Sequence, residues 1–213
     1  PKLGGSPEQA YLAGLLHDLG KVVLDMVLPK AYARVLEMSR NRRCALCLVE
    51  RSMLGIDYYT AGKRLGEHWG LPSSIRDVMW LHGQPIESLP DDASRELVSL
   101  ITLAESWARD MHLGWWGDYG EPLDLYEIAV KLGVEPNFFK DHAKQLIEGV
   151  SQRGEVLGLG DHAQEDLLIE SLTGANRRLA QLNTELRVKA QSSMSRLRLL
   201  DAIDAFNAQL SAD

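Results

Sequence analysis

Cysteine, long apolar runs and clustered positive charge are scarce in this 213-residue sequence, and each scarcity excludes a class of protein. Two cysteines, Cys44 and Cys47, are too few for the disulfide framework of a small secreted domain. No apolar run approaches the roughly 18 residues that a membrane-spanning helix needs. With 23 basic and 30 acidic residues, the net charge of −7 argues against a dedicated nucleic-acid surface. We therefore expect a cytoplasmic protein, with neither membrane nor nucleic acid as its partner.

The N-terminal stretch also lacks the marks of a targeting segment. It has no cationic start and no cleavage site, so we do not expect a secretory signal. It also lacks an initiating Met, which suggests a fragment or a processed form. The composition, 45% hydrophobic and 25% charged, is ordinary for a globular protein with a sizeable core.

Apolar residues recur at helical spacings along most of the sequence, and no alternating run is long enough to indicate a sheet. A segment rich in apolar positions runs from Glu8 to Val23, and its composition predicts a buried central helix. The same reasoning predicts helices over 31–38, 44–53, 57–69, 73–82, 93–112, 124–132 and 136–150. The predicted fold class is all-α.

The glycine-containing stretch 151–166 is the best candidate for a boundary between residues 1–150 and 167–213. Beyond it, apolar residues follow the 4-3-4-3-4 spacing of a coiled-coil seam: Leu168, Leu172, Ala175, Leu179, Leu182 and Leu186. The pattern lapses at Lys189, Ser193 and Arg196 and resumes at Leu199. We expect a long C-terminal helix that forms a homodimer and leads towards a further sensor domain.

The motif HDLGK, residues 17–21, is the sharpest chemical feature. Adjacent His17 and Asp18 can offer an imidazole nitrogen and a carboxylate oxygen to one divalent metal, which would acidify a bound water. Lys21 could neutralise a phosphate. The plainer alternative is a buried, hydrogen-bonded His–Asp pair that ties helices together.

Several motifs accompany this pair in a fixed order: AYLAGLLHDLGKVVLD, then GIDY at 55–58, AGKRL at 61–65 and WGLP at 69–72. Together they resemble the HDOD domain, an HD-related output domain of bacterial signalling proteins, from about residue 8 to residue 150. The resemblance implies an HD-like helical bundle, and that the family's N-terminal helical half is absent from this chain. It also implies attached receiver, kinase, GAF or GGDEF-type domains as partners.

Comparison with the related HD phosphohydrolases implies an incomplete metal site. His17 and Asp18 match the ligand pair, and His82 and Glu105 fall where a later His and a distal Asp would lie. Catalytic relatives, however, carry further histidines where this sequence has Tyr58 and Leu81, and a neutral phenol or an aliphatic chain cannot replace an imidazole. We expect no cofactor, or a divalent metal (Fe, Mn or Zn) at a residual site.

Two other groups of residues have structural readings that we favour. Cys44 and Cys47 have CxxC spacing, but a second ligand pair for zinc is missing, so we interpret them as structural. The aromatic residues Trp107, Trp115, Trp116 and Tyr119 could line a ligand or partner surface, but we favour packing of a loop onto the bundle.

Three functions remain. The first is a non-catalytic signal-transduction module, part of a response regulator or sensor kinase, that relays a signal through the bundle and a connector helix. The second is a metal-dependent phosphohydrolase acting on a nucleotide or cyclic dinucleotide. The third is a dimerising scaffold. The incomplete ligand set favours the first.

Overall fold

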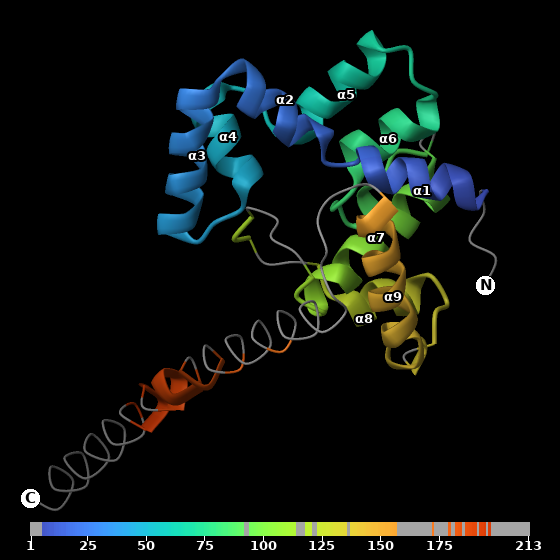
Figure 1. Ribbon diagram of the computed structural model, residues 1–213. Helices are drawn as coiled ribbons and strands as arrows, with labels where there is room; N and C mark the ends of the chain where they lie inside the picture. The colour runs from blue at the N-terminus through green and yellow to red at the C-terminus, as the bar shows by residue number, and fades with distance from the viewer. Residues whose placement is uncertain are drawn as a thin grey trace, which may run out of the picture. The chain divides into compact units, whose positions relative to one another are not determined.

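The computed structural model describes residues 6–156, apart from 92–93, 114–117, 121–122 and 136, together with scattered residues between 172 and 196. The chain divides into two units, Pro1–Asp161 and His162–Asp213. The boundary between the units falls inside the predicted linker. The described part of the first unit contains only helices (Figure 1). They are α1 (Pro7–Leu16), α2 (Leu19–Val27), α3 (Pro29–Arg42), α4 (Leu46–Leu54), α5 (Tyr58–His68), α6 (Ser73–Leu81), η1 (Ile86–Ser88), α7 (Arg95–Asp110), α8 (Leu125–Lys131) and α9 (Asn137–Val156). The prediction of an all-α fold is confirmed.

The segment predicted as one buried central helix is instead two helices. Ser6 caps α1 by accepting a hydrogen bond from the Gln9 amide, and the helix ends at Leu16. His17 and Asp18 form the turn before α2. Only Ala13 of α1 is buried, while other apolar residues of this helix remain exposed, among them Tyr11, Leu12 and Leu15. The prediction of burial was wrong for α1 because apolar composition all round a helix does not tell which of its faces a neighbour covers.

Helix α2 packs closely against α5 through glycines. A Cβ atom at Gly20 would overlap the backbone carbonyl oxygen of Tyr58 and lie 2.8 Å from the Gly62 nitrogen. Helix α5 starts where Asp57 accepts a hydrogen bond from the Thr60 amide. This close approach fixes the turn at His17–Asp18 beside the start of α5.

Three apolar clusters build the first unit. The first cluster joins α1, α6 and α7 around Val78 and Val98. The second cluster joins the four helices α2, α3, α4 and α5 around Val35 and Leu46. The third joins α7 to α8 and α9 around Ile128. Helix α7 contributes to the first and third clusters, so it links the two ends of the unit (Figure 1).

Helix α9 continues to Val156, past the predicted end at Val150, so the predicted linker begins later than residue 151. In the second unit, the described residues are helical, including 182–184 and 186–190. The rest of the predicted C-terminal helix lies outside the described residues. Among the helices that the structure describes, none combines the length and the apolar character required to cross a membrane.

Candidate metal centre and adjoining cavity

The turn between α1 and α2 brings His17 and Asp18 to the middle of the helical bundle. His82 reaches the same point from the C-terminal end of α6, where it is fully buried. The two imidazole rings meet edge to face, with their centroids 4.9 Å apart. The structure thus brings together three residues that the sequence proposed for one site.

Both histidines are held through the Nδ1 atom. His17 Nδ1 lies 2.6 Å from the Gly14 carbonyl oxygen, and His82 Nδ1 lies 2.7 Å from that of Val78. A carbonyl oxygen can only accept, so each Nδ1 carries the proton and donates it. Each Nε2 is therefore directed into the site, the arrangement found when a backbone carbonyl orients a metal-ligating histidine.

Asp18 lies between the two Nε2 atoms. Its Oδ2 is 3.5 Å from His17 Nε2, and its Oδ1 is 3.4 Å from His82 Nε2. Lys21 also contacts this carboxylate, with its Nζ 2.6 Å from Oδ2. Burial alone would raise the pKa of Asp18, but His82, His17 and Lys21 outweigh it and hold that pKa below its ordinary value. Asp18 is therefore a carboxylate at neutral pH.

Glu105 enters the site from α7. Single ligand atoms of His17, His82 and Glu105 all lie within 4.8 Å of one another. The other side of Glu105 faces Arg109, whose nitrogen is 2.8 Å from Oε1. Burial lowers the pKa of His17, more than Asp18 and Glu105 raise it, so its imidazole is neutral at pH 7 and can act as a ligand.

These residues fit a divalent metal ion. Asp18 Oδ1 and His82 Nε2 are buried, and neither makes a regular hydrogen bond within the described part of the chain. Their separation of 3.4 Å equals the ligand–ligand edge of a tetrahedral zinc site with bonds of about 2.1 Å, roughly 3.4 Å. Two imidazoles and two carboxylates also suit iron or manganese. Three of the four predicted donors, His17, His82 and Glu105, therefore form one cluster, and Asp18 contacts both histidines; metal binding itself stays a prediction.

The two departures from the catalytic pattern lie where they prevent further ligation. Tyr58 is buried at the start of α5, and Lys21 Nζ sits 4.6 Å from the centre of its ring. Burial strongly raises the pKa of the Tyr58 phenol, which stays neutral and is a poor metal ligand. Leu81 points into the apolar cluster of α1, α6 and α7.

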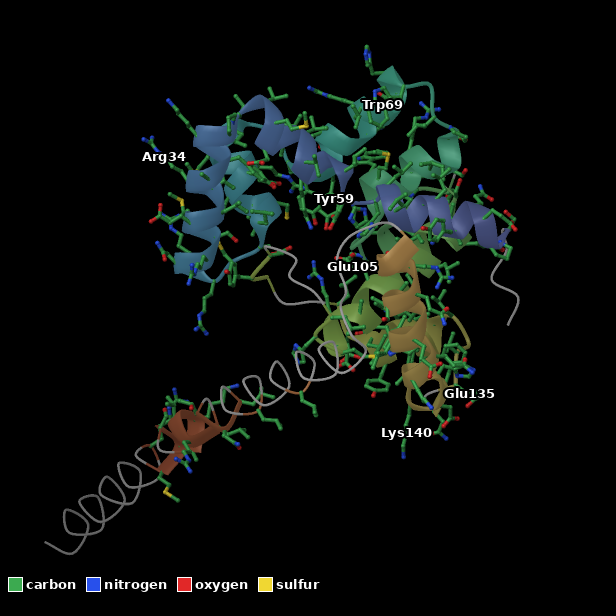
Figure 2. The ribbon with its side chains drawn as sticks, viewed as in Figure 1. Arg34, Tyr59, Trp69, Glu105, Glu135 and Lys140 are labelled. Atoms are coloured by element: carbon green, nitrogen blue, oxygen red, sulfur yellow. The ribbon has the colours of Figure 1, made fainter. Side chains whose placement is uncertain are left out.

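A cavity of about 150 Å³ adjoins the cluster at Glu105. Its lining includes Tyr59 and Glu105, which come from α5 and α7 and are labelled in Figure 2. Arg109 and Asp118 also line it, with 3.9 Å between their charged groups. Asp118 Oδ1 in turn accepts hydrogen bonds from the Leu46 amide at the start of α4 and from the Gly120 amide.

Sequence reasoning missed Tyr59, Arg109 and Asp118, because nothing in the local pattern around them signals a shared cavity. Lys21 was assigned to a phosphate, whereas in the structure it pairs with Asp18. Glu105 was the only candidate metal ligand on α7, and Arg109 follows it at the i+4 spacing of a helical ion pair.

The cysteines and tryptophans that the sequence singled out lie outside the metal-ligand cluster or outside the described residues. Cys44 and Cys47 are free thiols, and Cys47 lines the cavity without a second ligand pair among the described residues. Trp107 packs against Phe138 and Phe139. Trp115 and Trp116 lie outside the described residues.

Comparison with known proteins identifies the first part of the chain. The family model of the HDOD domain matches residues 2–85, which include His17, Asp18, Tyr58 and His82 but not Glu105. This match ends well before residue 150, the limit expected from the motifs. An uncharacterized protein of Treponema pallidum (strain Nichols) is 24% identical over 100 residues, which are 47% of this chain and 19% of that protein.

No solved structure matched the chain. The family match covers the HD motif, in which half-buried His17 and Asp18 contact each other and Asp18 also contacts buried His82. The chain therefore carries an HDOD domain, matched over residues 2–85.

Proposed function

We propose that this chain is a non-enzymatic signalling module, located in the cytoplasm, in which the HDOD bundle passes a signal to attached domains. The observation that carries the proposal is the position of the polar cluster. His17 and Asp18 come from the α1–α2 turn, His82 from the end of α6 and Glu105 from α7. A change in the charge or occupancy of the cluster therefore acts on three separate elements at once.

The contacts of the cluster continue towards α4. Glu105 pairs with Arg109, Arg109 faces Asp118, and Asp118 binds the Leu46 amide. This series of polar contacts connects the centre of the bundle to the α3–α4 pair. Contiguous contacts of this kind are a candidate route for coupling, which only a measured coupling energy can establish.

Three features argue against hydrolysis of a nucleotide. The adjoining cavity of about 150 Å³ is smaller than the roughly 300–1,000 Å³ of typical ligand pockets. In addition, Lys21 already neutralises Asp18, and neutral Tyr58 stands where catalytic relatives have an imidazole. The geometry therefore supports a relay better than it supports a hydrolase.

The test is a search for turnover under conditions that favour it. Purified protein is loaded separately with Mn²⁺, Fe²⁺ or Zn²⁺ and incubated with nucleotides and cyclic dinucleotides. We expect no product above the level of a His17→Ala variant. Metal-dependent turnover that this variant loses would overturn the proposal.

A metal-dependent phosphohydrolase is the second candidate, and one observation favours it. Both histidines direct Nε2 towards Asp18, as metal-ligating histidines do. A bound divalent metal would supply an acidified water. The metal itself would be held by His17, His82, Asp18 and Glu105. This function requires about one or two equivalents of metal in the purified protein as well as turnover. Metal without turnover would instead support a relay whose signal is the metal ion.

A further inference from the structure

The second unit exposes a row of leucines. Leu172, Leu179, Leu182 and Leu186 lie at helical positions, and 63, 57, 38 and 62% of their surfaces are exposed. Large apolar side chains repeated at regular spacing on one helix face usually mark a contact surface.

The spacing of this row identifies the kind of surface. Leu172, Leu179 and Leu186 are seven residues apart and define position a of a heptad. Leu168, Ala175 and Leu182 then occupy position d. An average apolar spacing of 3.5 residues keeps the row facing a second helix with the same repeat, because both helices supercoil around each other.

We infer that a second copy of this chain covers the leucine row, with the two helices parallel and in register over residues 168–186. A helix of identical sequence offers the same a and d layers, so each leucine layer meets its own counterpart. The row ends at Leu186 because Lys189 occupies the next d position and Ser193 the next a position.

The charges beside the row decide the orientation. In the parallel arrangement, Arg178 at position g faces Asn183 at position e of the second copy, and Glu185 faces Ala190. In the antiparallel arrangement that overlaps the same six layers, position g faces position g. Arg178 then lies opposite Arg178 of the second copy, next to the two-fold axis. Only the parallel arrangement avoids this like-charge contact.

The oligomeric state of the full chain tests the interface. Sedimentation velocity over a range of concentrations should show a reversible monomer–dimer equilibrium. Leu179→Asp should raise the dimer dissociation constant at least about tenfold, since it buries two carboxylates in the seam. Val188→Asp is the matched control: Val188 is 59% exposed but lies at position c, outside the row. Its dissociation constant should equal that of the unchanged chain.

Three results would overturn the inference: a monomer at every concentration, a Leu179→Asp variant that dimerises normally, or equal weakening by both variants. A further variant tests the orientation. In a Cys44→Ser, Cys47→Ser background, Leu182→Cys should form a covalent dimer on mild oxidation, because parallel helices place the two thiols in one layer. The antiparallel arrangement pairs residue 182 with residue 172. A variant that sediments as a dimer but does not cross-link would therefore refute the parallel arrangement.

Discussion

His82 Nε2 lies 3.4 Å from Asp18 Oδ1, and both atoms are buried at the point where the α1–α2 turn meets the end of α6. His82 donates through Nδ1 to the Val78 carbonyl, so Nε2 is the ring nitrogen that faces Asp18. This contact joins the α1–α2 turn to the end of α6, two places that are far apart in the sequence.

Replacing Asp18 with Asn should destabilise the metal-free protein by about 1–3 kcal/mol at pH 7, because the ion pair with Lys21 is lost and the contacts with His17 and His82 are weakened. The folded-state pKa of Asp18 is depressed, so its contribution to stability is present at neutral pH. It disappears as the pH falls through the ordinary pKa of Asp, about 3.9, and below. Urea unfolding of the two proteins at several pH values, with a chelator present, measures this difference.

Exposed Asp25 on α2 provides the control for that experiment. Asp25→Asn makes the same chemical change on the surface and should alter stability by less than about 0.5 kcal/mol. An equal effect of the two substitutions would mean that the cluster contacts contribute nothing specific.

Gly20→Ala should destabilise the protein by more than about 3 kcal/mol or prevent folding. The added methyl group would overlap the Tyr58 carbonyl oxygen, which belongs to backbone and cannot rotate away. Gly14→Ala is the matched control on α1, since its methyl group would meet only Ile101 Cδ1 at an ordinary 3.8 Å. That variant should gain stability from helix propensity, up to about 1 kcal/mol. Thermal unfolding of both variants distinguishes close helix packing from a general intolerance of glycine substitution.

Glu50 should make the stability of the protein fall as the pH rises. It is fully buried and accepts hydrogen bonds from the Tyr32 hydroxyl at 3.0 Å and the Tyr58 amide at 2.8 Å. Burial raises its pKa from 4.5 to about 7. Between these two pKa values the folded protein retains a proton that the unfolded chain releases. The free energy of unfolding therefore falls by up to about 3 kcal/mol by pH 8.

Glu50→Gln separates this charge effect from the hydrogen bonds. The amide can accept from the Tyr58 amide and donate to the Tyr32 hydroxyl, but it does not titrate. Urea unfolding should show the variant to be more stable than the unchanged protein at pH 8 and similar to it at pH 5. A variant that is less stable at pH 8 would show that the ionised carboxylate is favourable where it lies.

Asp118→Ala should loosen the first turn of α4. Ala45 at the cap position provides no side-chain acceptor, and Asp118 Oδ1 accepts from the Leu46 amide at 3.0 Å instead. Losing a helix cap costs about 1 kcal/mol. Hydrogen exchange should therefore become faster at the Leu46 amide and stay unchanged at the Thr60 amide, which Asp57 caps independently. Unchanged protection at Leu46 would contradict this account.

Helix positions followed from the sequence because they depend on local chemistry. The helices predicted over 57–69, 73–82 and 124–132 from apolar spacing correspond to α5, α6 and α8. The same local logic failed between Glu8 and Val23. The break at His17–Asp18 lies beside the close packing of Gly20 against α5. That contact is with a distant part of the sequence, so the residues around the break do not predict it.

The sequence by itself determined the all-α fold, since helical spacing expresses it directly, and its resemblance to the HD phosphohydrolases pointed to His17, Asp18, His82 and Glu105 as candidate donors. Only the tertiary structure decided that Lys21 pairs with Asp18, that the two Nε2 atoms converge on one carboxylate, and that Arg109 and Asp118 share a cavity with Glu105. These relations join residues from separate helices, and their distances are set by how closely the helices pack.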